Sequence, residues 1–171
     1  MKPLFLASFL LVAGCATLET QVEIKAPASA VRAVLYDFGD YPKWNPFILK
    51  VDGDMEEGGR INVTVMPAGG PAISASAKVI SVTPNHLAWE GSGRPNEVLG
   101  PFSVDLPGVL NASHDFIIEE LGPGRTLFRN NVDYSGAASG SYDTKPIEAG
   151  LDAMNEALKK RAEEFAGTQA R

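Results

Sequence analysis

The sequence predicts an α+β domain in which a curved antiparallel sheet packs against one long C-terminal helix. Three observations predict this class: an amphipathic stretch ends the chain, most of the preceding residues alternate between apolar and polar side chains, and short turn signals separate the alternating stretches. Strands joined by short turns form antiparallel sheets, and a twisted sheet with one apolar face can wrap a helix.

The first strand and two short helical segments are expected near the start of this domain. Residues 22–25 alternate between apolar and charged side chains, which indicates a strand. Residues 27–35 begin with proline and then carry apolar side chains at helical spacing, which indicates a short helix. Residues 40–44 are expected to form one further helical turn.

Six further stretches have strand character, and glycine, proline, asparagine or aspartate marks the turns between them. They span residues 47–51, 60–66, 74–83, 87–91, 111–121 and 125–134. With the first strand they make a sheet of seven strands.

One long stretch, residues 92–110, interrupts this regular spacing of strands. It is rich in glycine and proline but also carries apolar side chains, Phe102 among them. A loop of this length in a compact domain is usually functional or disordered. A lid over a pocket and a plain insertion resting on the sheet edge both remain open.

The final helix is predicted over residues 146–165. Asp143 or Thr144 is a candidate N-cap and Gly167 a candidate stop. Large apolar side chains recur along it at helical spacing: Ile147, Leu151, Met154, Leu158 and Phe165. Burial of these side chains contributes on the order of 10 kcal/mol gross. Because an isolated helix is marginal in water, this one must lie along an extended apolar surface.

The first residues have the features of a secretory signal. Lys2 precedes an apolar run over residues 4–13 that is too short to span a bilayer. Residues 12–15 (VAGC) also resemble a bacterial lipobox, in which Cys15 is diacylated and becomes the mature N-terminus. An ordinary signal peptide that contains a cysteine is the alternative. The lipobox is favoured because Cys15 is the only cysteine of the chain.

We therefore divide the chain into a signal peptide (residues 1–14), a lipidated N-terminus with a short tether (15–20) and one domain (21–171). Two or three acyl chains hold a protein firmly at a membrane. Residue Ala16 is not aspartate, so the resemblance to lipoproteins of double-membraned bacteria favours the outer membrane, facing the periplasm.

Composition excludes several classes of function. The formal net charge of −6 argues against nucleic acid or an anionic membrane surface as a partner. A zinc site is not expected, because the chain has two histidines and no cysteine besides Cys15. Phosphate-cradling, dinucleotide-binding and G-x-S-x-G motifs are missing too, so we expect no cofactor. Protein partners are not indicated.

The last predicted hairpin shows which side chains face inward. In residues 114–120 and 126–134 the even positions carry the apolar side chains, so they should face the core. A three-residue turn at 122–124 pairs Ile118 with Phe128, Phe116 with Asn130, and His114 with Val132. His114 and Asn130 then become diagonal neighbours.

Three polar side chains on this inward face, His114, Asn130 and Tyr134, are the candidate site residues. Unpaired buried polar groups are costly, whereas a binding pocket combines apolar walls with a few placed polar groups. Three interpretations of these groups are open. They contact a ligand, they act as general acids or bases, or they form hydrogen bonds with one another or with a buried water. Apolar candidates line either a cavity or a dry core: Trp44, Phe47, Trp89, Phe102, Phe116, Phe128, Leu151 and Met154.

Five stretches, in this order, resemble the SRPBCC superfamily of START-related helix-grip proteins, in particular its polyketide cyclase/dehydrase-like bacterial branch. They are residues 41–47 (YPKWNPF), 87–89 (LAW), 114–116 (HDF), 134–136 (YSG) and 150–155 (GLDAMN). The resemblance covers about residues 18–166. It implies a seven-stranded sheet curved around the C-terminal helix, two short helices closing one end, and a hydrophobic cavity between helix and sheet.

Three functions follow as hypotheses. The first is a membrane-anchored periplasmic protein that binds a hydrophobic small molecule or lipid in the cavity. The second is a cyclase- or dehydratase-like enzyme that uses acid–base chemistry at His114. The third is a structural envelope protein with a filled core. The step from fold to function rests on the resemblance, because one fold hosts many functions.

Overall fold

Seven strands, one long helix and three short helical segments make up the part of the chain that the computed structural model describes, residues 16–93, 110–136 and 143–169. The strands are β1 (Ala16–Ile24), β2 (Ile48–Gly53), β3 (Arg60–Val65), β4 (Ile73–Thr83), β5 (His86–Gly93), β6 (Leu110–Gly122) and β7 (Arg125–Ser135). The helices are α1 (Ala28–Leu35), η1 (Phe38–Asp40), α2 (Tyr41–Trp44) and α4 (Lys145–Gln169).

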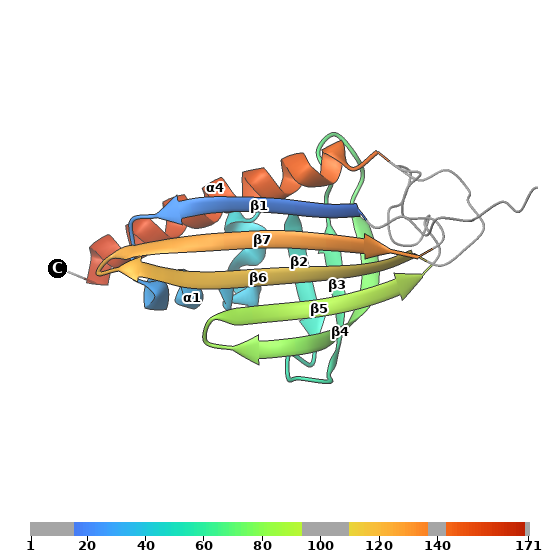
Figure 1. Cartoon of the computed structure of the whole chain (residues 1–171), viewed down its shortest axis with the longest axis horizontal. Helices are drawn as coiled ribbons and strands as arrows, with labels where there is room; N and C mark the ends of the chain where they lie inside the picture. Colours follow the sequence, from blue (N-terminus) through green and yellow to red (C-terminus); the bar gives the residue numbers. More distant parts are fainter. Residues whose placement is uncertain (1–15, 94–109, 137–142, 170–171) are drawn as a thin grey trace, which may run out of the picture.

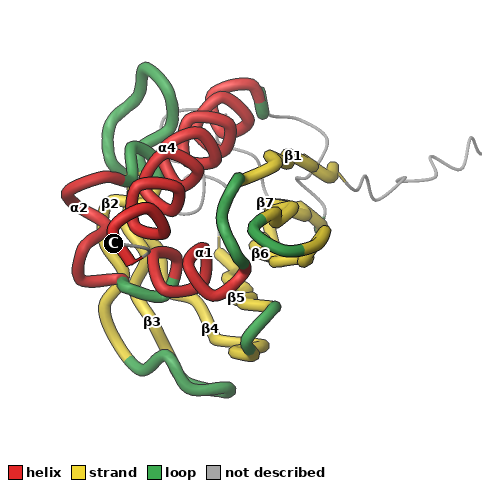
Figure 2. Tube along the Cα trace, turned by 90° about the vertical axis from the view of Figure 1, so that its left-hand side faces the viewer, coloured by secondary structure: helices red, strands yellow, loops and turns green. Residues whose placement is uncertain are grey.

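The strands form one antiparallel sheet in the order β1-β7-β6-β5-β4-β3-β2. The sheet curls, and α4 lies across its concave side with α1 and α2 near the C-terminal end of that helix (Figures 1 and 2). This arrangement confirms the predicted α+β class and the sheet of seven strands around a C-terminal helix. It also places the first strand beside the last one, because β1 pairs with β7 along its whole length.

The hairpin of β6 and β7 has the register expected from the sequence, although the predicted three-residue turn is a two-residue turn. Gly122 pairs with Arg125, and a bulge between Glu120 and Gly122 restores the register. Ile118 lies opposite Phe128, Phe116 opposite Asn130, and His114 opposite Val132. The even-numbered residues of both strands are the buried ones over most of the hairpin, so the alternation identified the inward face correctly. The register follows because a one-residue slip would turn every apolar side chain toward solvent.

Strand β1 begins earlier than its sequence pattern suggests. Residues 16–20, which the sequence alone assigns to a tether, form the first half of β1, from Ala16 opposite Tyr134 to Thr20 opposite Asn130. The local alternation is weak there, because Thr20 occupies an inward position that is usually apolar. Pairing with β7, far away in the sequence, extends the strand.

Helix α4 begins close to its predicted start but runs past its predicted end. The side chain of Asp143 accepts a hydrogen bond from the Lys145 backbone N–H at 3.1 Å. Gly167 does not end the helix, which continues to Gln169. A glycine ends a helix when it adopts a left-handed conformation, and Gly167 does not have a positive φ angle. Among the described residues, no helix is both long and apolar enough to cross a lipid bilayer.

Candidate ligand-binding site

A cavity of about 320 Å³ lies between the curled sheet and the first turn of α4. The side of the cavity toward α4 is bordered by Ile147, and the segment before β2 contributes Phe47. Strands β3 to β7 supply the remaining described lining residues: Val63, Val65, Ser74, Ala75, Ser76, Ala77, Trp89, Gly91, Ser92, Gly93, Ala112, His114, Val132 and Tyr134. Its volume is at the lower end of the range for small-molecule sites.

The cavity lies where the ladder between β4 and β5 ends and where small residues line the wall. β4 pairs with β5 only between Lys78↔Glu90 and Thr83↔His86, so residues 73–77 have no ladder with residues 91–93. A side chain added at Gly91 would approach the carbonyl oxygen of Ser76 to 3.0 Å. Ala75, Ala77 and Ala112 also line the wall, so at these described positions only small side chains face the cavity.

Phe47, which forms one wall of the cavity, is positioned from both sides. The Asn45 side chain accepts hydrogen bonds from the backbone N–H groups of Phe47 at 3.0 Å and Ile48 at 2.9 Å. On the other side Gly150 of α4 lies against the Phe47 ring, and a Cβ atom at Gly150 would stand only 2.3 Å from it. Glycine at this helix position therefore permits the close approach that keeps the ring at the cavity edge.

The described cavity lining contains no charged side chain. Two of its serines are engaged elsewhere: Ser74 hydrogen-bonds with Thr64 and Ser76 donates to Asn62, both in exposed positions. His114 and Tyr134 are the buried polar side chains that border the space. Burial raises the pKa of the Tyr134 hydroxyl, so this group stays neutral at physiological pH.

Behind His114, a buried chain of hydrogen bonds runs away from the cavity. His114 Nε2 lies 2.6 Å from Asn130 Oδ1, and Asn130 Nδ2 donates to Asn155 Oδ1 at 2.9 Å. Asn155 Nδ2 donates to Thr20 Oγ1 at 2.9 Å, and Thr20 Oγ1 donates to the main-chain oxygen of Asn130 at 2.8 Å. We call these four residues the buried polar network. It joins β1, β6, β7 and α4.

His114 is neutral in this environment. Burial lowers the pKa of its imidazole to about 4, and the hydrogen bond to Asn130 and the charge of Asp115 oppose this shift only in part. Aromatic rings surround it, with the Phe116 ring centroid at 4.2 Å and the Trp89 centroid at 5.5 Å. Its hydrogen-bond partner is an amide and not a carboxylate.

The structure brings some of the candidate residues to the cavity and places others elsewhere. Phe47, Trp89, His114 and Tyr134 border it, and Asn130 lies one layer behind, bonded to His114. The remaining described apolar candidates do not border it: Phe116, Phe128, Leu151 and Met154 are packed in the core. They lie in the part of the core where β1 and β7 pack against α4.

Trp44 lies at a different place from the other aromatic candidates. It borders a second hollow near the end of α4, whose lining also includes the charged residues Asp40, Arg161 and Glu164. Arg161 and Lys43 both form ion pairs with Asp40 there. Trp44 is therefore not part of the apolar cavity.

Two further predictions lie outside the described residues. The first concerns Phe102 and most of residues 92–110, for which a lid and a plain insertion are the two alternatives. The other is Cys15 with the signal segment before it, so lipidation stays a prediction.

Sequence reasoning missed Thr20, Asn155 and the small wall residues. Asn155 does leave a signal: it follows Leu151 by four positions and precedes Leu158 by three, so a polar residue occupies the apolar face of α4. The wall leaves another signal. Ala75, Ala77 and other small residues occupy inward positions of neighbouring strands, where a filled core would carry large side chains.

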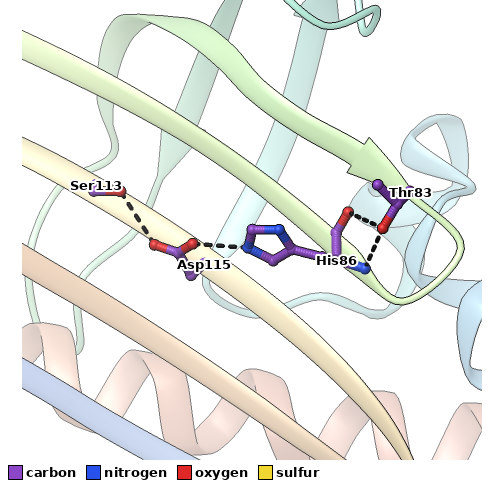
Figure 3. A network of polar contacts seen from close by, with 4 residues as sticks. All are labelled: Thr83, His86, Ser113 and Asp115. Atoms are coloured by element: carbon purple, nitrogen blue, oxygen red, sulfur yellow. Dashed lines mark hydrogen bonds and ion pairs between the residues drawn. The ribbon is translucent and has the colours of Figure 1, made fainter.

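The outer face of the sheet carries a second polar cluster, which Figure 3 shows. Asp115 accepts from Ser113 at 3.1 Å and contacts His86 Nε2 at 2.9 Å, and the His86 backbone N–H donates to Thr83. In a nucleophilic triad the histidine stands between serine and carboxylate. Here the carboxylate stands between the other two, so His86 does not activate Ser113, and the cluster serves to join β5 to β6.

Comparisons with known proteins agree with this architecture. A family described as polyketide cyclase/dehydrase and lipid transport matches residues 16–163. A START superfamily protein from Mycobacterium smegmatis has 21% sequence identity and a TM-score of 0.62, with 87% of this chain and 98% of that chain covered. No curated protein matches the chain in sequence at a significant level.

Two enzymes of known structure are also similar in fold. Norcoclaurine synthase from Thalictrum flavum, in complex with dopamine and hydroxybenzaldehyde, has 15% identity and a TM-score of 0.61, with 96% of this chain and 98% of that chain covered. The Zhui aromatase/cyclase from Streptomyces sp. R1128 has 18% identity and a TM-score of 0.58, with 92% and 97% covered. At these identities the similarity shows the fold alone.

Proposed function

Because the chain belongs to the polyketide cyclase/dehydrase and lipid transport family, as its resemblance to START-related helix-grip proteins predicted, we propose that its cavity binds one uncharged, mainly hydrophobic small molecule or lipid. The observation that carries the proposal is an apolar cavity of about 320 Å³ whose described lining holds no charged side chain. Mostly apolar walls with a few polar groups are typical of small-molecule sites.

Binding is favoured over catalysis by the state of His114. A general acid must hold a proton at the working pH, and an efficient general base has a pKa near that pH. Burial lowers the pKa of His114 to about 4, so at neutral pH its ring is deprotonated and only weakly basic. Cyclase- or dehydratase-like chemistry remains the second candidate, because the family includes such enzymes and His114 borders the cavity.

A larger side chain in the cavity is expected to weaken ligand binding without unfolding the protein. Ala112 borders the cavity on β6, so Ala112→Phe should weaken binding of the neutral fluorescent probe N-phenyl-1-naphthylamine at least about tenfold. The measurement is the rise in probe fluorescence during titration. Asn111→Phe is the matched control, because Asn111 is the preceding residue of β6 and points to the exposed face.

Equal affinity in the two variants would contradict this location of the site. Absence of saturable binding to the unaltered chain would remove the proposed function as a whole. Solvent extraction and mass spectrometry of the protein purified from its native host then identify the natural ligand.

The proposal extends to anchoring at the periplasmic face of the outer membrane through acylated Cys15. Support comes from the position of β1: Ala16, joined to Cys15 by a peptide bond, lies opposite Tyr134, and Tyr134 borders the cavity. An anchor at Cys15 would therefore hold the end of the sheet where β1 begins, on the right in Figure 1, close to the membrane. A hydrophobic ligand would then travel only a short distance through water.

Replacement of Cys15 tests this anchor. Cys15→Ser is expected to remove incorporation of radiolabelled palmitate and to shift the protein from the outer-membrane fraction to the soluble periplasmic fraction. Two acyl chains bind membranes firmly, so their loss should change the distribution almost completely. Ala16→Ser, the neighbouring substitution, should leave labelling and localisation unchanged. If neither the unaltered chain nor Ala16→Ser incorporates palmitate, the lipobox prediction is contradicted.

A further inference from the structure

We infer that the ligand of this cavity carries a hydrogen-bond donor, a hydroxyl or N–H group, which it donates to Nδ1 of His114. The inference rests on the proposed function and names the chemical class of its ligand. It follows from the direction in which each proton of the buried polar network must point. That direction is set far from the cavity, at a backbone carbonyl group of β7.

The main-chain oxygen of Asn130 can only accept a hydrogen bond. Thr20 Oγ1 lies 2.8 Å from this oxygen and must therefore point its one hydroxyl proton at it. Both groups are almost fully buried, so water does not offer the Thr20 hydroxyl another acceptor. Thr20 Oγ1 is then an acceptor toward its other neighbour.

The direction of the Thr20 hydroxyl proton determines how the side-chain amides of Asn155 and Asn130 are oriented. Asn155 presents its Nδ2 group to Thr20 Oγ1 at 2.9 Å, because the hydroxyl proton is already used. Asn155 Oδ1 consequently faces Asn130 and accepts from Asn130 Nδ2 at 2.9 Å. With its Nδ2 engaged in this way, Asn130 turns its oxygen, Oδ1, toward His114.

The orientation of the Asn130 amide in turn determines the tautomer of His114. Nε2 lies 2.6 Å from Asn130 Oδ1, an acceptor, so Nε2 must carry a proton. Because the burial of the imidazole lowers its pKa to about 4, the ring holds a single proton at neutral pH. Nδ1 therefore has a free lone pair and is a hydrogen-bond acceptor.

His114 presents this acceptor at the cavity. It borders the cavity and keeps 7% of its surface exposed, whereas Asn130, on the Nε2 side of the ring, is 0% exposed and does not border it. A ligand that displaces water from the cavity must replace the hydrogen bond at Nδ1. A donor group does this, while a ligand that carries only acceptors leaves Nδ1 unpaired, which is costly in a buried site.

A matched set of neutral probes tests the inference: naphthalene, 2-naphthol and 2-methoxynaphthalene, each titrated against the chain by quenching of tryptophan fluorescence. We expect 2-naphthol to bind about tenfold more tightly than 2-methoxynaphthalene, since a lost buried hydrogen bond costs about this factor. In His114→Phe the preference should fall to about one, while naphthalene still binds.

The outcomes separate the two proposals. If naphthalene does not bind, the proposed function fails. If naphthalene binds but the naphthol and its methyl ether bind equally, or the ether binds more tightly, only the donor inference is overturned.

A second experiment tests whether Thr20 positions the His114 proton without touching the ligand. Nitrogen NMR of the imidazole rings should show His114 as the Nε2–H tautomer, and only one other histidine, His86, needs to be distinguished. In Thr20→Val we expect both tautomers and a weaker preference for 2-naphthol. Thr126→Val is the matched control, because buried Thr126 also donates to a backbone oxygen, that of Ala26 at 2.8 Å, outside the network.

A purely structural role of Thr20 would weaken all three probes equally and leave the tautomer unchanged. That result, or an Nδ1–H tautomer in the unaltered chain, would overturn the inference.

Discussion

Replacement of Asn130 by leucine is expected to lower the free energy of unfolding by about 4 kcal/mol, since each buried group left without a partner costs about 1–3 kcal/mol. Asn130 is fully buried and bonds to both His114 Nε2 and Asn155 Oδ1. Leucine has a similar size but can neither accept the first hydrogen bond nor donate the second. Urea denaturation at pH 7.5, followed by circular dichroism, measures the loss.

The control for this prediction is the adjacent residue of β7. Asn131 faces the other side of the sheet, and its Oδ1 has no hydrogen-bond partner among the described residues. Asn131→Leu should therefore change the free energy of unfolding by less than about 1 kcal/mol. A small loss in Asn130→Leu as well would show that His114 and Asn155 find other partners, and the buried polar network would lose its structural role.

Acidification is expected to destabilise the protein through His114. Burial lowers the pKa of the folded-state imidazole to about 4, whereas an unfolded histidine has its ordinary value near 6.5. Between these values the unfolded state binds the proton and the folded state does not. Stability is therefore complete above pH 6.5 and decreases as the pH falls toward 4. Linkage gives a loss of about 2 kcal/mol between pH 7.5 and pH 5.

His114→Gln isolates this contribution, because glutamine keeps an N–H donor for Asn130 but has no ionisable ring. The remaining ionisable groups are common to both proteins and cancel in the difference. Urea denaturation of both at pH 7.5 and pH 5 should show that the unaltered chain loses about 2 kcal/mol more than the variant. Parallel loss in the two proteins would mean that His114 can be protonated in the folded state.

The register of the β6–β7 hairpin shows what local pattern can predict. The alternation of side chains identified the inward face, and the short turn between the strands determined which residues lie opposite one another. These two facts were sufficient to place His114 beside Asn130, which the 2.6 Å hydrogen bond between them bears out. Both depend only on residues close together in the chain.

The rest of the buried polar network was beyond the reach of the same reasoning. Thr20 and Asn155 come from opposite ends of the chain and meet only because β1 pairs with β7 and α4 packs across both. An isolated Thr20 in a weakly alternating stretch gave no sign of a strand. The first half of β1 was therefore missed together with the residue that orients the network.

By itself the sequence determined the class of fold, the order of its elements, the inward face of the last hairpin and the apolar stripe of the final helix, because periodicity and turn chemistry act over a few residues. Tertiary structure decided where empty space remains. The cavity lies where the ladder between β4 and β5 ends, at Lys78 and Glu90, and where small residues of several strands meet. The volume of a cavity depends on how backbone segments that are distant in the sequence are placed relative to one another. No single stretch of sequence therefore specifies it.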